Sequence, residues 1–333
     1  MAGAKPAAMS EPTLAGTWRL LLEDEPLWLK RLAAEGPKET PLNPKPQGLF
    51  YWSFLPASPV ADAGWTAPGK SLHAAGHQTM TTRLAVKPKE LNVCGWQAVS
   101  TLFARHPEEV RRLFFDAATG RRAGEFCSQL AQQKKVYRQL DAAGLEKVAG
   151  TKLHGGIVAV IGERPLKKVT RDVLEGWGRT KAPLLLLDRV SNANNVGAIV
   201  RTAAFFGVKA IIVPDHPAQA LPGEAAWRVA EGGMEFVDFF RVPSLPGICD
   251  ELKRHHFLVG TSLRGNQLSP AAVREHGLPR PAALILGNEE RGMAPEVAAK
   301  CDRLGKIPGE NSVESLNVSA AAAVLCWEFF GKR

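Results

Sequence analysis

Clusters of polar residues follow apolar, strand-like stretches in the second half of the chain. The first cluster, Asn192, Asn194 and Asn195, comes after PLLLLD and opens a helical pattern that carries Arg201. One asparagine is enough to cap a helix, so three indicate a further task. Amide groups can orient a bound molecule, and a guanidinium can contact phosphate or polarise a hydroxyl. This cluster therefore favours a site that positions an anionic or hydroxyl-bearing ligand.

Two further clusters have the same placement. After the apolar stretch AALIL, Gly287 permits close approach of the backbone, and Asn288 and Glu289 stand at the end of the predicted strand. The third cluster follows the predicted strand KIP and precedes the last apolar run. Helix capping by Ser315 or Asn317 is the ordinary explanation of its polar residues. Each cluster alone is compatible with turn chemistry, but three of them after strands of one domain predict a shared site.

The elements that carry these clusters alternate regularly over residues 182–333. The predicted strands are PLLLLD, VKAIIVP, EFVDFFRV, HFLVGTS, AALILG and KIP, with helical patterns between them and a helix at the end. Near-continuous apolar strands separated by helices indicate an α/β fold with a parallel sheet covered on both faces. Ligands of such sheets bind beyond the carboxyl ends of the strands, where the three clusters lie.

Three regions precede this domain. Residues 91–162 alternate short helices and strands and form a small α/β unit, and residues 163–181 are a polar, basic linker. Residues 1–90 hold 11 of the 24 prolines, which interrupt helices and central strands. We expect a largely irregular, partly disordered extension with one short amphipathic helix within residues 14–36.

The composition limits the kind of partner that the protein is expected to bind and the compartment in which it is expected to act. The net charge of +9 favours an anionic partner such as nucleic acid. The five cysteines are scattered without a C-x-x-C pair, and His73 and His77 lack further ligands, so we expect neither disulfides nor a metal. No signal peptide or membrane-spanning run is found, which predicts a cytoplasmic protein without membrane contact. The glycine-rich signatures of dinucleotide and nucleoside-triphosphate sites are absent.

The three clusters match the motifs of a known family. Residues 182–333 resemble the catalytic domain of the SpoU/TrmH family of RNA ribose methyltransferases. The matching motifs are N-x-x-N-x-G-x-x-x-R (Asn192 to Arg201), L-G-x-E-x-x-G (Leu286 to Gly292) and I-P followed by S-L-N-x-S (Ile307 to Ser319). GWQAV and HGGIVA resemble the family's ribosomal-protein-like RNA-binding domain, and AEGGMEFV is similar to its YfiF-like branch. The resemblance covers residues 91–333.

The resemblance implies a C-terminal trefoil knot, a homodimer formed through the knotted domain, and S-adenosylmethionine held in the knotted loops. Arg201 would act on the ribose 2′-hydroxyl, and Asn195, Glu289, Ser315 and Asn317 would arrange the catalytic site. The residues expected to bind the cofactor are Leu286, Gly287, Asn288, Gly292, Ile307, Pro308, Leu316 and Ser319. Departures from the family pattern occur at Asn192-Ala193, Gly155, Gly309, Asn311 and Trp327, and none removes one of these functional groups.

Chemistry leaves the role of Arg201 open. A ribose hydroxyl is a poor nucleophile, so methyl transfer needs alignment and help with one proton. Arginine is an awkward base because its pKa lies above ~12. Arg201 either contacts phosphate and polarises the hydroxyl, or abstracts the proton.

The predicted function is transfer of a methyl group from S-adenosylmethionine to a ribose 2′-hydroxyl in ribosomal or transfer RNA. The alternative is an RNA-binding or ribosome-assembly factor on the same fold that has lost transfer. A Rossmann methyltransferase acting on a small molecule would need a glycine-rich first loop, which is missing.

Overall fold

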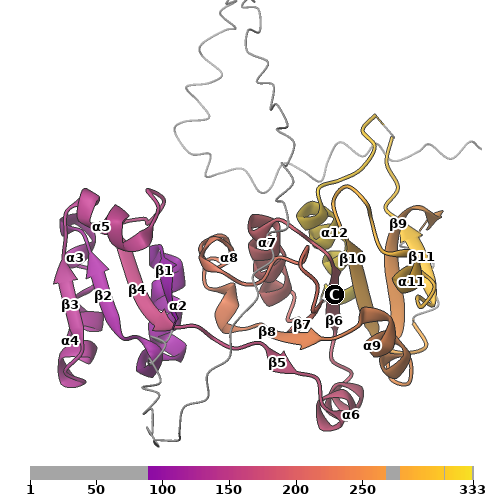
Figure 1. Ribbon diagram of the computed structural model, residues 1–333, viewed down its shortest axis with the longest axis horizontal. Coiled ribbons are helices and arrows are strands. Elements are labelled where there is room, and N and C mark those ends of the chain that lie inside the picture. Colours follow the sequence, from indigo (N-terminus) through magenta and orange to yellow (C-terminus); the bar gives the residue numbers. More distant parts are fainter. Residues whose placement is uncertain (1–88, 268–277, 311, 332–333) are drawn as a thin grey trace, which may run out of the picture. The chain divides into compact units, whose positions relative to one another are not determined.

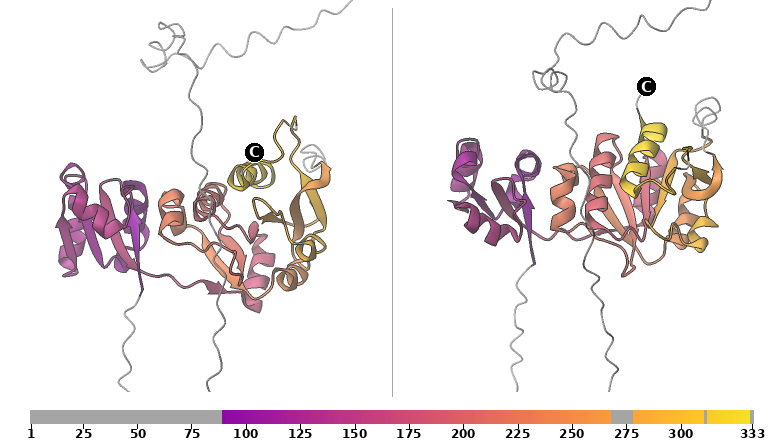
Figure 2. Two further views of the ribbon diagram at one scale, coloured as in Figure 1. Left: turned by 45° about the horizontal axis from the view of Figure 1, so that its top comes forward. Right: turned by 90° about the horizontal axis from the view of Figure 1, so that it is seen from above.

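The computed structural model describes residues 89–267, 278–310 and 312–331, which lie in one compact unit spanning residues 81–333. Residues 1–88 of the predicted N-terminal extension, with its amphipathic stretch and two histidines, lie outside the described residues, as does Asn311, whereas Glu90 belongs to a strand. No helix in the described part of the chain is both long and apolar enough to cross a membrane. The ribbon is drawn in Figure 1, and two further views in Figure 2.

A small four-stranded sheet comes first, with strand order β1-β4-β2-β3 (Figure 1). Its strands are β1 (Glu90–Cys94), β2 (Arg112–Phe115), β3 (Val136–Gln139) and β4 (Ile157–Gly162). Strand β4 runs antiparallel to β1 and β2, and β3 is an edge strand parallel to β2. The helical segments are α2 (Trp96–Arg105), η1 (Pro107–Glu109), α3 (Ala117–Gly120), α4 (Gly124–Gln132) and α5 (Ala142–Ala149).

Apolar side chains explain how these helices pack. Helices α2 and α4 cover one face of the small sheet, where Leu102 and Leu130 lie buried with Leu113. Helix α5 covers the other face, where Leu145 packs with Val158. The alternation of short helices and strands predicted for residues 91–162 is confirmed: RRLFFD, KKVYRQL and HGGIVAVIG contain β2, β3 and β4, and the predicted helical stretches contain α2 and α4. Strand β1 and helix α5 were not predicted, because a polar residue interrupts the apolar run in ELNVC and α5 is short.

A parallel seven-stranded sheet follows, with order β11-β9-β10-β6-β7-β8-β5. Every pairing in it is parallel, as predicted. The strands are β5 (Lys167–Lys168), β6 (Leu184–Asp188), β7 (Ala210–Pro214), β8 (Asp238–Val242), β9 (Phe257–Gln267), β10 (Ala282–Gly287) and β11 (Arg303–Lys306). Strands β6 and β10 are central neighbours and are buried at every position, which explains their unbroken apolar sequences.

Helices cover both faces of this sheet (Figures 1 and 2). The helical segments are α6 (Arg171–Thr180), α7 (Ala193–Phe205), α8 (Glu224–Ala230), η2 (Gly233–Glu235), α9 (Leu245–Leu252), α11 (Pro295–Ala298) and α12 (Val318–Phe330). Helices α7, α8 and α12 share one buried cluster with alternate residues of β6 and β7. Helices α6, α9 and α11 pack with the other residues of the same strands.

The predicted linker contains more structure than its polar composition indicated. Helix α6 lies within residues 163–181, and the short strand β5 pairs with β8 of the large sheet. Val173, Leu174 and Trp177 project from one side of α6 because they are separated by helical spacing. They pack against the large sheet, and Trp177 contacts Phe240 edge to face. Much of this segment therefore belongs to the large domain and packs against its sheet.

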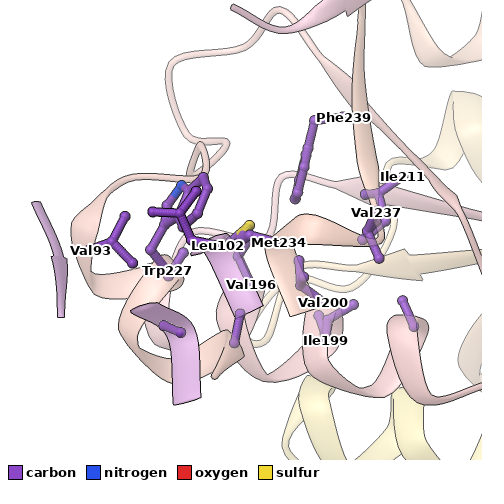
Figure 3. Packing of buried hydrophobic residues seen from close by; sticks show 14 of the residues in the cluster. Val93, Leu102, Val196, Ile199, Val200, Ile211, Trp227, Met234, Val237 and Phe239 are labelled. Atoms are coloured by element: carbon purple, nitrogen blue, oxygen red, sulfur yellow. The ribbon is translucent and has the colours of Figure 1, made fainter. Parts of the chain in front are cut away.

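One buried cluster continues from the small sheet to helix α7 (Figure 3). It contains Val93 and Leu102 of the small sheet and its helix α2, with Trp227 and Met234 between them and Val200 of α7. Burying a large apolar side chain stabilises a fold by about 1.5–3 kcal/mol, so this shared cluster is a substantial attachment. Polar contacts add to it, such as the backbone N–H of Asn92, which donates to Glu224 at 3.0 Å.

Candidate active site

The candidate site is built where strands β6 and β10 end side by side. In the sheet register the last residues of the two strands, Asp188 and Gly287, are partners. The loops that follow these strands carry the first two polar clusters, and the third lies just before α12, which packs on α7 and β10. The fold thus brings together clusters that are up to 122 residues apart in the sequence.

The first asparagine of the first cluster caps helix α7. The Asn192 side chain accepts hydrogen bonds from the backbone N–H groups of Asn194 at 2.8 Å and Asn195 at 3.4 Å. This is the ordinary N-cap arrangement. Because Asn192 satisfies the helix terminus, the Asn195 side chain is available for contacts outside the helix.

A chain of hydrogen bonds joins the three clusters through Asn195. The Asn195 amide donates to Glu289 Oε1 at 2.7 Å, and the Asn317 amide donates to Asn195 Oδ1 at 3.2 Å. Asn317 Oδ1 in turn accepts from Ser319, through its backbone N–H at 2.9 Å and its hydroxyl at 2.6 Å. We call Asn195, Glu289, Asn317 and Ser319 the amide chain.

The direction of every bond in the amide chain follows from one backbone group. The Ser319 N–H can only donate, so Asn317 must turn its oxygen toward it and its NH₂ group toward Asn195. Asn195 must then present its own oxygen to Asn317 and its NH₂ group to Glu289. Glu289 receives that donor as an acceptor. The chain therefore has one hydrogen-bonding polarity, and it ends on a carboxylate.

Residues of the loop after β10 hold Glu289 in place. Asn288 donates to the Arg189 carbonyl at 2.9 Å and, more weakly, to Glu289 Oε2 at 3.3 Å. Its oxygen accepts from the N–H groups of Glu290 and Arg291. The buried Asp188 accepts from the N–H of Ala294 at 2.6 Å, which ties the far end of the loop to β6. Sequence analysis missed Asp188, although an acid that ends an apolar strand is a usable signal.

The path of the loop after β10 requires a glycine at position 287. A Cβ there would overlap the backbone nitrogen of Met293 and the carbonyl carbon of Gly292. Gly292 has a φ of 67°, a region that favours glycine, and Asn288 and Gly292 exchange backbone hydrogen bonds at 3.1 and 3.0 Å. The close approach predicted at Gly287 is thus an approach of the loop 288–293 to the strand end.

Arg201 lies on a different side of α7 from Asn195. The two are six residues apart, which separates them by about 9 Å along the helix and roughly 120° around it. The Arg201 guanidinium pairs with Glu231 at 2.9 Å, and both side chains are at least half exposed. Glu231 was not among the predicted site residues, since it belongs to none of the three motifs.

The remaining predicted residues lie along the segment between β11 and α12. Ser315 and Leu316 are exposed, Ile307 packs partly against the core, and Leu286 is buried in β10. Among the hydrogen bonds between described residues, no backbone-to-backbone bond uses the peptide groups of residues 307–310 or 312–316. Buried or bound peptide groups require partners, so these groups can serve a ligand. They suit the backbone recognition predicted for S-adenosylmethionine.

An α/β domain with a parallel sheet and polar loops at the carboxyl ends of its strands belongs to the class of open α/β folds, which bind their ligands at that edge. The sequence profile of the SpoU rRNA Methylase family matches residues 182–327, and that of the RNA 2′-O ribose methyltransferase substrate-binding domain matches residues 92–181. The chain belongs to the SpoU rRNA methylase family.

Curated relatives span most of the described residues. The chain is 32% identical over 240 residues to the 23S rRNA (guanosine-2′-O-)-methyltransferase RlmB of Nitrosomonas europaea, covering 72% of this chain and 90% of the relative. It is also 32% identical over 244 residues to an uncharacterized tRNA/rRNA methyltransferase, YfiF, of Escherichia coli O157:H7, covering 73% and 69%.

A solved structure has the same fold. The SpoU methyltransferase AviRb of Streptomyces viridochromogenes, solved in complex with the cofactor AdoMet, superimposes with a TM-score of 0.54. The two chains are 24% identical, and the match covers 72% of this chain and 89% of AviRb.

Proposed function

We propose that this protein transfers a methyl group from S-adenosylmethionine to a ribose 2′-hydroxyl in ribosomal or transfer RNA. The observation that carries the proposal is the amide chain, because it links all three motifs of the family in one hydrogen-bonded unit. Family membership and the rRNA methyltransferase names of the relatives support the same reaction.

We assign the cofactor to the loops around the amide chain. S-adenosylmethionine supplies an electrophilic methyl group on a sulfonium. The peptide groups before α12 would hold it, with the exposed Leu316 against its apolar surface. Most of the cofactor residues predicted from the sequence lie in or beside these loops, whereas Leu286 is buried in β10 and Ser319 lies in the first turn of α12. AviRb, with the same fold, binds this cofactor, which supports the assignment.

The amide chain would orient the acceptor. A polar chain with fixed hydrogen-bonding directions holds a hydroxyl in one geometry, and alignment of this kind supplies much of the rate in a transfer reaction. Ser315 lies next to Leu316 and Asn317 with an exposed side chain, and it would contact the ribose. Arg201 would polarise the 2′-hydroxyl or take its proton.

We assign RNA binding to residues 91–162, with residues 163–181 as the connection and residues 182–333 as the transfer domain. Residues 91–175 contain 14 basic and 9 acidic residues, the largest basic surplus in the chain. The match of residues 92–181 to a substrate-binding domain supports this division.

A homodimer through the transfer domain is part of the proposal. Phe205 is 82% exposed and Trp327 is 62% exposed, and both project from the paired helices α7 and α12 with the half-exposed Val324 nearby. Exposed apolar groups gathered on one face are typical of protein interfaces. Arg201 lies one helical turn before Phe205, which puts it at the edge of the proposed interface. Phe205→Asp should yield monomers by light scattering, and retention of the dimer would contradict this interface.

We also propose that the chain is knotted. It leaves the sheet at the edge strand β11 and returns as α12 to pack on α7 and the central strand β10. A trefoil would require this return path to cross the loop that follows β10. Since the substrate is RNA and the cysteines are unpaired, we expect the protein to act in the cytoplasm.

Calorimetry and methylation mapping test the function. S-adenosylmethionine should bind the purified protein, and ribose methylation of stable RNAs should lose one or a few positions when the gene is deleted. Restoring the gene should restore them, whereas a gene carrying Glu289→Ala should not. Absence of binding at millimolar donor together with an unchanged methylation map would favour the alternative, an RNA-binding assembly factor.

A further inference from the structure

The turn from Glu231 to Glu235 follows α8, includes η2, and contacts both α7 and helix α2 of the small domain. We propose that Glu231 is a positioning residue for Arg201, and that the small domain fixes Glu231 by packing on the same turn. The proposal rests on the proposed methyl transfer and deepens it. It explains why a residue outside the three motifs holds the predicted catalytic arginine.

The contact itself is an ion pair at the surface. Arg201 Nη2 lies 2.9 Å from Glu231 Oε2, and the two side chains are 60% and 50% exposed. Pairs of this kind contribute little to stability, because water screens them and ordering two long side chains opposes them. A gain in stability therefore does not explain why the ion pair forms, and contacts other than the charge attraction must place Glu231 beside Arg201.

The backbone provides that placement. Glu231 ends α8 in the left-handed region, with φ 44° and ψ 50°, which residues other than glycine rarely adopt. A Cβ on Gly233 would lie 3.2 Å from the Arg201 Cα, so the turn rests directly on α7 at that residue. A Cβ on Gly197 would lie 2.5 Å from the Ala226 carbonyl oxygen, so α8 also packs directly on α7. These two close contacts fix Glu231 relative to Arg201.

The small domain holds the opposite side of the turn. A Cβ on Gly232 would lie 2.6 Å from the Thr101 hydroxyl, on helix α2. The Arg105 guanidinium of the same helix lies 4.6 Å from the centre of the Phe236 ring. The close packing at Gly232 and the cation–π contact hold the turn to α2. Helix α2 therefore helps to determine where Glu231 stands.

Ionic contacts secure the end of the turn. Arg164 bonds Glu235 at 2.9 Å and Glu109 of η1 at 2.7 Å, so it links the turn to the small domain. Burial raises the pKa of Glu235, and the charge of Arg164 opposes this shift. Movement of the small domain would thus displace Glu231 and, through it, Arg201. RNA bound to the small domain would act on the catalytic arginine by this route.

Replacement of Glu231 tests the pair. Glu231→Gln should lower kcat about ten- to hundredfold, the loss expected for a misplaced group, with KM for both substrates and the melting temperature unchanged. Glu231→Asp should recover part of the activity. The matched control is Glu175→Gln, which removes a similar exposed pair with Arg171 at 2.9 Å and should leave kcat unchanged. In an Arg201→Ala background, Glu231→Gln should have no further effect.

A second readout does not depend on catalysis. Phenylglyoxal modification of Arg201, followed by peptide mass spectrometry, should be several-fold faster in Glu231→Gln. Gly232→Ala should produce the same acceleration and the same loss of kcat, because the new methyl group would strike Thr101. Gly207→Ala is its control, since Gly207 has a similar φ of 75° but would meet nothing within 4 Å.

The outcomes separate the two proposals. Wild-type kcat and unchanged modification in Glu231→Gln would overturn the positioning role, as would a higher kcat, which would mean that Glu231 blocks Arg201. A wild-type protein without methyl transfer, but with faster Arg201 modification in the variant, would overturn the proposed function and leave the positioning role standing.

Discussion

The amide chain and the Arg201–Glu231 pair both depend on helix α7, but they are held in different ways. Asn195 is partly buried, and a hydrogen bond from a backbone N–H sets the direction of each amide in its chain. Arg201 and Glu231 carry opposite charges, lie in water, and are aligned by close packing of glycines. One region fixes its groups through side-chain bonds, and the other through backbone contact. Perturbing each in turn should reveal which kind of placement the reaction requires.

The largest effect is expected on the arginine side of this comparison. Arg201→Ala should lower kcat by about 10²–10⁴-fold, the range for loss of a group that assists proton transfer. Single-turnover kinetics and RNA binding, measured on the same preparation, separate its two roles. Retained RNA affinity means that Arg201 acts on the hydroxyl, and a parallel loss of affinity means a phosphate contact. Activity near wild type would remove Arg201 from the mechanism.

On the amide side, Asn195→Asp should lower kcat by about 10²-fold. The new carboxylate cannot donate to Glu289, and it puts two acids where a 2.7 Å hydrogen bond now lies. Asn194→Asp is the matched control, because it makes the same chemical change one residue earlier on an exposed side chain. Methyl transfer from labelled donor measures both. Equal activities of the two variants would show that the amide chain has no part in transfer.

The glycine behind the amide chain can be tested by stability. Gly287→Ala should lower the free energy of unfolding by about 1–3 kcal/mol, because the added methyl group would force the loop away from β10. Gly309→Ala has open space around it and should change stability little. Urea denaturation compares the two. A stable Gly287→Ala protein with full activity would mean that the loop yields without affecting Glu289.

The smallest expected effect is a dependence of stability on pH. It arises at the amino ends of the strands, on the side of the sheet opposite the amide chain. His256 is fully buried before β9, and its Nε2–H donates to the Ala182 carbonyl at 2.9 Å. Burial lowers the pKa of His256, so the folded protein resists a proton that the unfolded chain accepts below a pH of about 6.5. Stability should be constant above that pH and decline as the pH falls below it.

Denaturation at several pH values measures this decline. His256→Gln should reduce the slope of this decline. An identical slope in wild type and His256→Gln would assign the acid sensitivity to other groups. If the hydrogen bonds of the amide chain were lost at low pH while the free energy of unfolding stayed unchanged, the acid sensitivity of the site would be independent of that of the sheet.

The sequence predicted strands β6 to β10 because each contains an apolar run, but it did not predict the edge strand β5 and placed the last strand at KIP, whereas β11 is Arg303–Lys306. It predicted the residues of the amide chain because they belong to ordered motifs. It could not predict their bonding directions, which depend on contacts between residues as far apart as Asn195 and Asn317. The Glu231 contact was also missed, since a lone acid before two glycines resembles an ordinary turn. Close packing of glycines leaves no pattern of polarity in a sequence.

The amide chain also has a consequence for biosynthesis. Asn195 and Glu289, which bond each other, are translated before Asn317, and the hydrogen bond from Asn317 to Asn195 can form only after Asn317 has left the ribosome. A nascent chain that already contains the small domain can contact RNA, yet it lacks a complete site for the reaction. The order of synthesis thus places completion of the amide chain after synthesis of the small domain and of every strand of the large sheet.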